Sequence, residues 1–259
     1  MTGTQEINYT DFRKVYLTTG LAVTAQKNSS ATIPAYLIQL SFGKDLASAH
    51  KADTKREYFT SSAQLTSNHS PEDIVNQLMI AVTNFPRKQI GKVLSDCLVT
   101  GVQTANGSSE DKRLSTVFVT TSSLVEPGSR VGILAQKELV TTNIRNLDWH
   151  DFSKLDLRVG TLETCLISQT IDSVNSVNKV LFHIRLDNES LKTCVGLLQA
   201  HLNVNTLIGK QVLVLVNLDN PSKTQYFGEL GPIDTVLCTI EGETVLTPAK
   251  KVNNGYSLA

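Results

Sequence analysis

Short runs of alternating apolar and polar residues along this chain predict β-strands. In residues 33–43 the side chains of Ile38, Leu40 and Phe42 alternate with polar ones, which is typical of a strand with one buried face. Residues 180–186 show the same alternation in the second half of the chain. Turn residues and polar loops separate these runs at short intervals. The pattern therefore predicts an all-β fold with short helices.

The remaining elements are predicted from similar signals. A short helix is expected at residues 71–75, because Ser70 can cap it and Pro71 suits its first position. The polar residues 44–60 and 103–115 predict loops. Further strands are expected over residues 21–26, 61–66, 77–84, 95–101 and 117–119, and over residues 157–165, 192–198, 208–217, 233–240 and 245–248.

One ten-residue segment occurs twice, at residues 11–20 (DFRKVYLTTG) and at residues 151–160 (DFSKLDLRVG). Each copy predicts one helical turn, capped by its Asp, which leads into a strand. The Gly of that strand allows it to bend or to pack closely against another backbone. An aromatic residue, Tyr9 or Trp149, stands two places before each copy. The repeat indicates that the chain is a duplication of one unit.

The order of predicted elements after the two copies is the same. The spacing of matched residues drifts from 140 between Asp11 and Asp151 to 133 between Asn84 and Asn217, as expected of an old duplication with insertions. Units of about five short strands and a helix fit a small Greek-key barrel of the oligonucleotide- and oligosaccharide-binding (OB) type.

We therefore predict two tandem OB-fold β-barrels, at residues 1–140 and 148–259, joined by a polar connector. Residues 131–139 and 252–258 are apolar segments near the ends of the two units, and they would be costly to leave exposed. We expect them to pack between the barrels as a pseudo-twofold interface. The chain would then be an intrachain pseudo-dimer, and further oligomerisation stays open.

The net charge of zero hides a difference between the two halves. Residues 1–147 carry 15 Lys and Arg against 12 Asp and Glu, and residues 148–259 carry 9 against 12, which gives +3 and −3. Neither half has the basic excess typical of a nucleic-acid-binding domain. Any RNA affinity must come from a local basic patch, which the first half is better placed to supply.

Several classes of protein are disfavoured by what the sequence lacks. The 4 Cys lie far apart in hydrophobic runs, which predicts buried reduced thiols, and the 5 His have no metal-ligand spacing. There is no apolar run of membrane-spanning length and no signal-peptide core at the start, so we expect a cytoplasmic protein. No phosphate-binding loop, nucleophile motif or synthetase motif is visible, and we expect neither catalysis nor a cofactor.

These motifs resemble those of the tRNA-binding OB domains, which occur free, at the ends of methionyl- and other tRNA synthetases, and in multisynthetase-complex proteins. The second half is similar to the methionyl-tRNA synthetase C-terminal and EMAP-II-like members through residues 151–160 and the Asn-Leu-x-Pro-x-Lys-like residues 217–223. The first half resembles the CsaA-like branch through residues 42–43, 61–66 and 84–90. The resemblance implies a non-catalytic protein that binds tRNA by shape and phosphate contacts and assists aminoacyl-tRNA synthetases.

A different class of function is the alternative: an interaction module that docks synthetases or client polypeptides and binds RNA weakly. Residues 225–228 (QYFG) stand where the family usually has Arg-Gly, and Gln89 replaces a loop Arg, so cations are lost where RNA would sit. Salt-dependent retardation of tRNA would favour the first function. Co-purification with synthetases after nuclease treatment would favour the second.

The candidate RNA-binding residues flank the predicted barrel faces. Cations there can follow an RNA backbone, although the same charges can simply keep a strand edge solvated. An Asn at a strand end can read RNA or cap its own turn. Phe85 and Tyr226 are candidates for base stacking, with packing as the alternative for Phe85. The candidate site comprises Gln64, Asn84, Arg87, Lys88 and Lys92 in the first half, and His183, Arg185, Lys192, Asn217 and Lys223 in the second.

Overall fold

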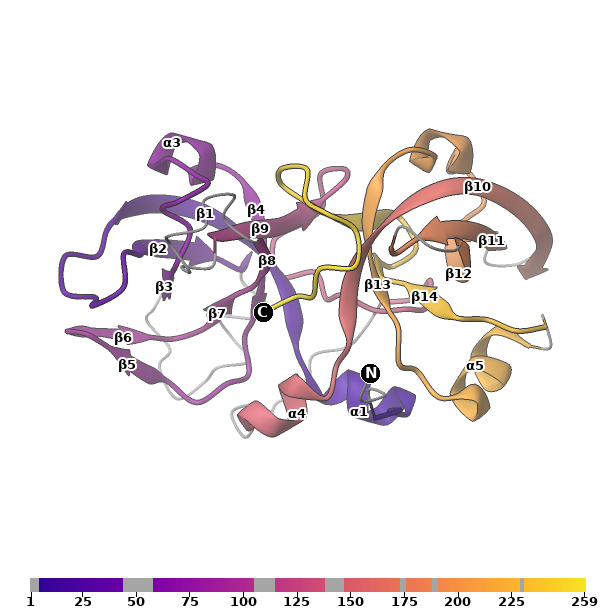
Figure 1. Cartoon of the computed structure of the whole chain (residues 1–259), viewed down its shortest axis with the longest axis horizontal. Coiled ribbons are helices and arrows are strands. Elements are labelled where there is room, and N and C mark those ends of the chain that lie inside the picture. The colour runs from indigo at the N-terminus through magenta and orange to yellow at the C-terminus, as the bar shows by residue number, and fades with distance from the viewer. Residues whose placement is uncertain are drawn as a thin grey trace.

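The computed structural model describes residues 5–43, 58–104, 115–137, 147–172, 176–187, 191–228 and 231–259. The two halves of the chain form two β-rich units that lie side by side, with strands of both meeting between them (Figure 1). We call them the first unit and the second unit. The loops predicted over residues 44–60 and 103–115 fall largely outside the described residues.

The second unit is a closed five-stranded barrel with the strand order β10-β11-β12-β14-β13. Strands β12 and β14 are parallel, and the other neighbouring pairs are antiparallel. This order is the Greek-key arrangement of an OB fold. The strands are β10 (Leu157–Asp172), β11 (Val177–Arg185), β12 (Leu191–Gln199), β13 (Gln211–Leu215) and β14 (Thr235–Leu237).

The first unit has the same order, β3-β2-β1-β4-β7, in a sheet that is closed by side-chain and loop contacts. Between its end strands, the Val99 amide donates to Ser61 Oγ over 3.2 Å, and the Asp96 amide donates to the Thr60 carbonyl over 2.7 Å. The predicted all-β fold of two OB-type barrels is thus confirmed. The strands are β1 (Leu17–Lys27), β2 (Tyr36–Ser41), β3 (Phe59–Ala63), β4 (Leu78–Val82) and β7 (Leu98–Val99).

The short helices differ between the units after the fourth strand. Both units open with a helix, α1 (Tyr9–Lys14) or α4 (Trp149–Ser153), and place one turn before the fourth strand, α3 (Pro71–Ile74) or η2 (Val204–Leu207). The predicted cap and first residue of α3, Ser70 and Pro71, are confirmed. After the fourth strand the second unit has the helix α5 (Asn220–Phe227). The first unit has the hairpin β5 (Lys88–Ile90) and β6 (Val93–Ser95), where the sequence predicted a basic loop.

Backbone hydrogen bonds exchange reciprocally between the two units. Gly132 of the first unit and Thr239 of the second form a pair of bonds of 2.8 and 2.9 Å, and Ala259 and Gly101 form the converse pair at 2.8 and 3.1 Å. A sheet with the order β15-β16-β9-β8 also contains strands of both units. An isologous dimer interface has this reciprocity. The strands are β8 (Gly101–Thr104), β9 (Ser115–Thr121), β15 (Thr239–Ile240) and β16 (Thr244–Pro248).

The hydrophobic core has three parts, one inside each barrel and one between them. The shared cluster includes Val131, Ile133, Leu134 and Val252, so the two apolar segments pack between the units as the sequence predicts, apart from residues 138–139, which are not described. Burial of this cluster makes each unit depend on the other, since either alone would expose a large apolar face.

Glycine at the end of each repeated segment is required by packing. A Cβ on Gly20 would lie 2.7 Å from a ring carbon of Phe42, and one on Gly160 would lie 2.6 Å from Ile184 Cδ1. The close approach predicted from the repeat is therefore made by core side chains of the neighbouring strand rather than by another backbone.

Candidate nucleic-acid interface

The two opening helices lie side by side at the edge where the units meet (Figure 1). Their caps are Asn8 and Asp148, which accept from the backbone amides of Asp11 and Asp151 over 2.9 and 2.8 Å. The prediction that Asp11 and Asp151 themselves cap these turns is therefore wrong. Both carboxylates instead bind the Lys three residues later, over 2.8 and 3.2 Å, and the bond from Lys14 is the main cause of a lowered pKa for Asp11.

Asn84 and Asn217 are buried and join structural elements together. The side-chain oxygen of Asn84 accepts from the amide of Tyr16 over 3.0 Å, and its Nδ2 donates to the carbonyl of Lys14 over 2.7 Å. Asn217 makes the matching bonds at the end of α4, of 3.0 and 2.8 Å. Its Nδ2 also donates to the carbonyl of Gln5, in the other unit, over 2.7 Å. Because their amides are occupied inside the protein, we leave both residues out of the interface proposed below.

The hairpin β5–β6 presents two of the first-unit candidates to solvent. Lys88 and Lys92 are exposed, on β5 and in the turn, and Gln64 is exposed directly after β3. Arg87 differs from them because its Nε lies 2.9 Å from the carboxylate of Asp96, which is almost completely buried. Arg87 therefore neutralises a buried charge and fixes the base of the hairpin.

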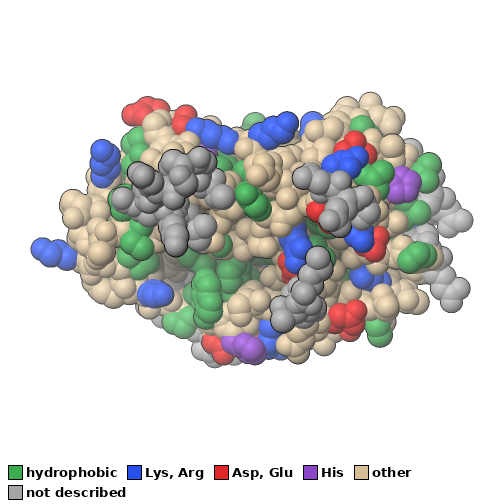
Figure 2. Space-filling view, viewed as in Figure 1, with side chains coloured by type: hydrophobic (Ala, Val, Ile, Leu, Met, Phe, Trp, Pro, Cys, Tyr) green, Lys and Arg blue, Asp and Glu red, His purple; other side chains and the backbone are tan. Residues whose placement is uncertain are grey.

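The second-unit candidates on β11 and β12 lie on the outside of the barrel. His183 is exposed and its Nδ1 lies 2.8 Å from Thr164 Oγ1, and Arg185 forms an ion pair of 2.8 Å with Glu163. Lys192 pairs in register with Ile184 on the adjacent strand and is half-buried. Figure 2 shows Lys and Arg side chains dispersed over one face among Asp and Glu, without a continuous basic patch. On this face, the described Lys and Arg side chains would therefore contact an RNA at separate points.

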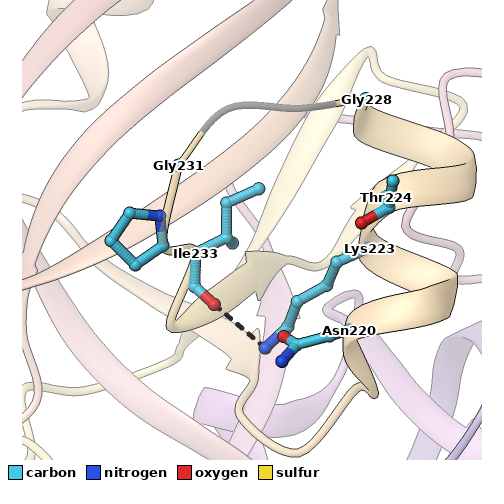
Figure 3. Close-up of a pocket in the computed structure, with 7 residues that line it drawn as sticks. Asn220, Lys223, Thr224, Gly228, Gly231 and Ile233 are labelled. Atoms are coloured by element: carbon cyan, nitrogen blue, oxygen red, sulfur yellow. Dashed lines mark hydrogen bonds between the residues drawn. The ribbon is translucent and has the colours of Figure 1, made fainter.

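Lys223 is turned into the protein. Its side chain is buried on α5, and Nζ donates to the carbonyl of Ile233 over 3.0 Å, beside an open pocket of about 460 Å³ (Figure 3). Burial lowers the pKa of Lys223, while Glu6, Asp234 and Asp219 oppose that shift. The contact resembles that of Arg87 with Asp96, since both side chains join the connection after the fourth strand to the segment before the fifth.

One cation–aromatic pair distinguishes the units and was missed in the sequence. In the second unit Arg158 forms a two-pronged pair with Asp156, with both bonds at 2.7 Å, and this pair raises the pKa of Arg158. In the first unit Tyr16 takes the place of that Asp, and the guanidinium of Arg130 lies 3.6 Å from the centre of its ring. Arg130 comes from the segment bridged to Thr18, more than a hundred residues later in the chain, so sequence spacing gave no signal.

His69 is a second residue that the sequence did not single out. Its side chain is 4% exposed, its ring lies 4.6 Å from that of Phe118, and neither ring nitrogen has a hydrogen-bond partner among the described residues. Burial, and then the charge of Lys250, lower its pKa from 6.5 to about 4, against a smaller opposing effect of Asp73. The histidine is therefore neutral at physiological pH.

Among the described residues, the thiols and the acidic groups form no metal-binding cluster. The four cysteines are free; Cys97, Cys194 and Cys238 are buried, and burial raises the pKa of Cys194 to about 12. Within the described ranges, His, Cys, Asp and Glu side chains do not gather in threes in a way that would hold a metal ion. Every helix in the described part of the chain is too short or too polar to cross a bilayer.

Several solved structures are similar to this chain, although no protein-family model matches it. The CsaA chaperone protein from Picrophilus torridus is 30% identical over 48% of this chain and 97% of its own, with a TM-score of 0.37. The MetRS-related protein from Pyrococcus horikoshii is 19% identical over 48% and 95%, with a TM-score of 0.35. The C-terminal domain of Plasmodium vivax p43 is 11% identical over 72% and 92%, with a TM-score of 0.42.

The 30% sequence identity to the CsaA chaperone extends over 97% of that chain. The strand order of both units is that of an OB barrel. The resemblance predicted from the motifs is confirmed: this chain resembles the tRNA-binding OB-fold superfamily, of which CsaA forms one branch.

Proposed function

We propose that this chain is a non-catalytic tRNA-binding protein that holds tRNA mainly through its phosphates and its shape, and that it assists aminoacyl-tRNA synthetases. The observation that carries the proposal is the pair of exposed lysines, Lys88 and Lys92, which one hairpin holds beside an OB barrel. Lysines on a loop beside such a barrel suit a phosphate backbone better than a base edge.

The proposed contact surface is smaller than the set of candidates in the sequence. Lys88, Lys92 and Gln64 form its first-unit part, and Arg185, Lys192 and His183 its second-unit part. Arg87 contributes to it by holding the hairpin through Asp96. Asn84, Asn217 and Lys223 support the fold instead, because their polar atoms are bound inside the protein.

The proposal includes pairing of the two barrels within one chain, so that one molecule offers two related surfaces. The reciprocal bonds of Gly132 with Thr239 and of Ala259 with Gly101 support this pseudo-dimer. Two linked surfaces of modest affinity bind one RNA more tightly than either alone if both can reach it. Pairing thus adds to the affinity that the two hairpin lysines provide alone.

The salt dependence of tRNA binding tests the proposal. Four phosphate contacts, from Lys88, Lys92, Arg185 and Lys192, with a slope of about −0.7 each, predict that log K falls by roughly 2.8 per tenfold rise in salt. The double variant K88A/K92A should bind more weakly and reduce that slope to roughly −1.4. The double variant K137A/K210A, which removes two exposed lysines elsewhere, is the matched control.

Equal affinity and slope for K88A/K92A and the parent would show that the hairpin is not the RNA surface. Absence of tRNA retardation by the parent at low salt would overturn the proposed function as a whole. If synthetases then co-purify with the chain after nuclease treatment, the chain is a docking module.

A further inference from the structure

Trp149 is the single tryptophan of the chain, and it is 61% exposed although other aromatic rings hold it. Its ring stacks on Phe85 with centres 5.9 Å apart and planes at 22°, and it lies 5.3 Å from Phe152. Phe85 and Phe152 contact each other edge to face at 5.8 Å. Phe85 comes from the first unit and the other two from α4, so contacts between the units orient the exposed ring.

Tyr9 of the first unit matches Trp149 in the repeat, but its ring is covered. Tyr9 is 6% exposed, because Tyr226 of α5 lies against it with ring centres 4.6 Å apart. Its amide also donates to Ser222 of the same helix over 3.2 Å. The first unit has the hairpin β5–β6 in place of α5, and Trp149 keeps most of its surface open to solvent. The exposure thus follows from a difference between the two copies.

Residues of both charges stand next to Trp149 in the chain. Asp148 is exposed and caps α4, and Asp151 pairs with Lys154, which directly follows this helix, over 3.2 Å. The residues that follow Phe85 are Pro86, Arg87 and the exposed Lys88. An open aromatic face whose supporting ring stands close in the sequence to an exposed lysine suits single-stranded RNA, because a base can stack on the face while a phosphate contacts the cation.

We propose that Trp149, supported from behind by Phe85, is a stacking platform for an unpaired base of bound RNA. The inference rests on the proposed function and adds to it: the hairpin lysines bind phosphates, and Trp149 binds one base through its flat face. Stacking of this kind accepts any base, because every base has a π-face. Phe85 is a positioning residue, since it lies on the other side of the indole ring.

The intrinsic fluorescence of the full chain reports on this one site. Titration with a single-stranded hexanucleotide of cytidine, and separately with bulk tRNA, should quench the tryptophan emission with the same midpoint as the binding of labelled RNA. Free N-acetyltryptophanamide in the same titration corrects for light absorbed by the RNA. Trp149→Ala should weaken hexanucleotide binding by roughly 5- to 150-fold, whereas Trp149→Phe should retain most of it.

Two variants separate stacking from general damage. Phe85→Ala keeps Trp149 but removes the ring that orients it. RNA should then bind more weakly and quench the tryptophan emission less. Leu124→Ala, at a residue 93% exposed, removes an apolar side chain elsewhere and should change neither. If tRNA binds with the predicted salt dependence while emission is unquenched and Trp149→Ala binds like the parent, the platform is refuted and the proposed function survives. Failure of labelled tRNA to bind the parent would refute the proposed function itself.

Discussion

Replacement of the buried His69 should change how the stability of the protein depends on pH. In the folded chain both ring nitrogens lie without hydrogen-bond partners among the described residues, and the pKa falls from 6.5 to about 4. The unfolded chain takes up a proton near its ordinary pKa, whereas the folded chain does so only near pH 4. The free energy of unfolding must therefore decrease as the pH falls through this window.

The magnitude follows from the difference between the two pKa values. A difference of about 2.5, at about 1.4 kcal/mol for each pKa unit, gives a loss of at most about 3.5 kcal/mol between about pH 7 and pH 4. Lys250 and Asp73 are the charged groups that act on the ring, and their effects oppose each other. Burial therefore dominates, and His69→Leu should abolish this contribution while leaving the fold intact.

Urea unfolding followed by circular dichroism, at several pH values from about 7 to about 4.5, measures the effect. At neutral pH, His69→Leu should be as stable as the parent or more stable, since it removes two unsatisfied polar atoms. Its advantage should grow as the pH falls. His201→Leu removes a histidine whose side chain is 65% exposed and is the control. A stability difference between His69→Leu and the parent that stays constant with pH would refute the reasoning.

Three further outcomes test the packing. Gly160→Ala should cost about 1–3 kcal/mol, measured by urea unfolding, because its Cβ would meet Ile184; wild-type stability would contradict the close packing. Asn217→Ala should cost at least about 1–3 kcal/mol in the same assay, because it leaves the buried amide of Asp156 unpaired; loss of RNA binding with unchanged stability would assign it to the interface instead. Residues 1–137 and 147–259 should aggregate when expressed separately and assemble when co-expressed, as sedimentation can show; two soluble, non-interacting halves would contradict the shared core.

The sequence by itself predicted the barrel strands and the repeated order of elements, because these depend on local periodicity, but it missed the hairpin β5–β6. The matched residues Asp96 and Asp234 occupy equivalent places: the amide of each donates to the carbonyl of Thr60 or Thr193, and the carboxylate of each accepts from the amide of that same Thr. A repeated order of apolar runs and turns implies a repeated topology, whatever the side chains on the surface.

Which polar residues remain available for binding was decided only by the tertiary structure. Arg87, Lys223 and Asn217 stand in motifs that resemble RNA-binding loops, yet a carboxylate and backbone carbonyls outside those motifs occupy their polar atoms. Local sequence does not reveal those partners, because folding brings them together from separate segments. The predicted caps Asp11 and Asp151 were wrong for a related reason, since Asn8 and Asp148 were already placed to bond the same amides.

Tyr9 and Trp149 show most clearly that local sequence does not predict the exposure of a side chain. Both stand two places before the repeated segment, and local pattern treats them alike. In the folded chain Tyr9 is 6% exposed and Trp149 61%. The difference arises because a helix follows the fourth strand of the second unit and a hairpin follows that of the first, and only the helix covers the ring. The exposure of a side chain depends on what packs against it. For Tyr9, the covering element belongs to the other unit.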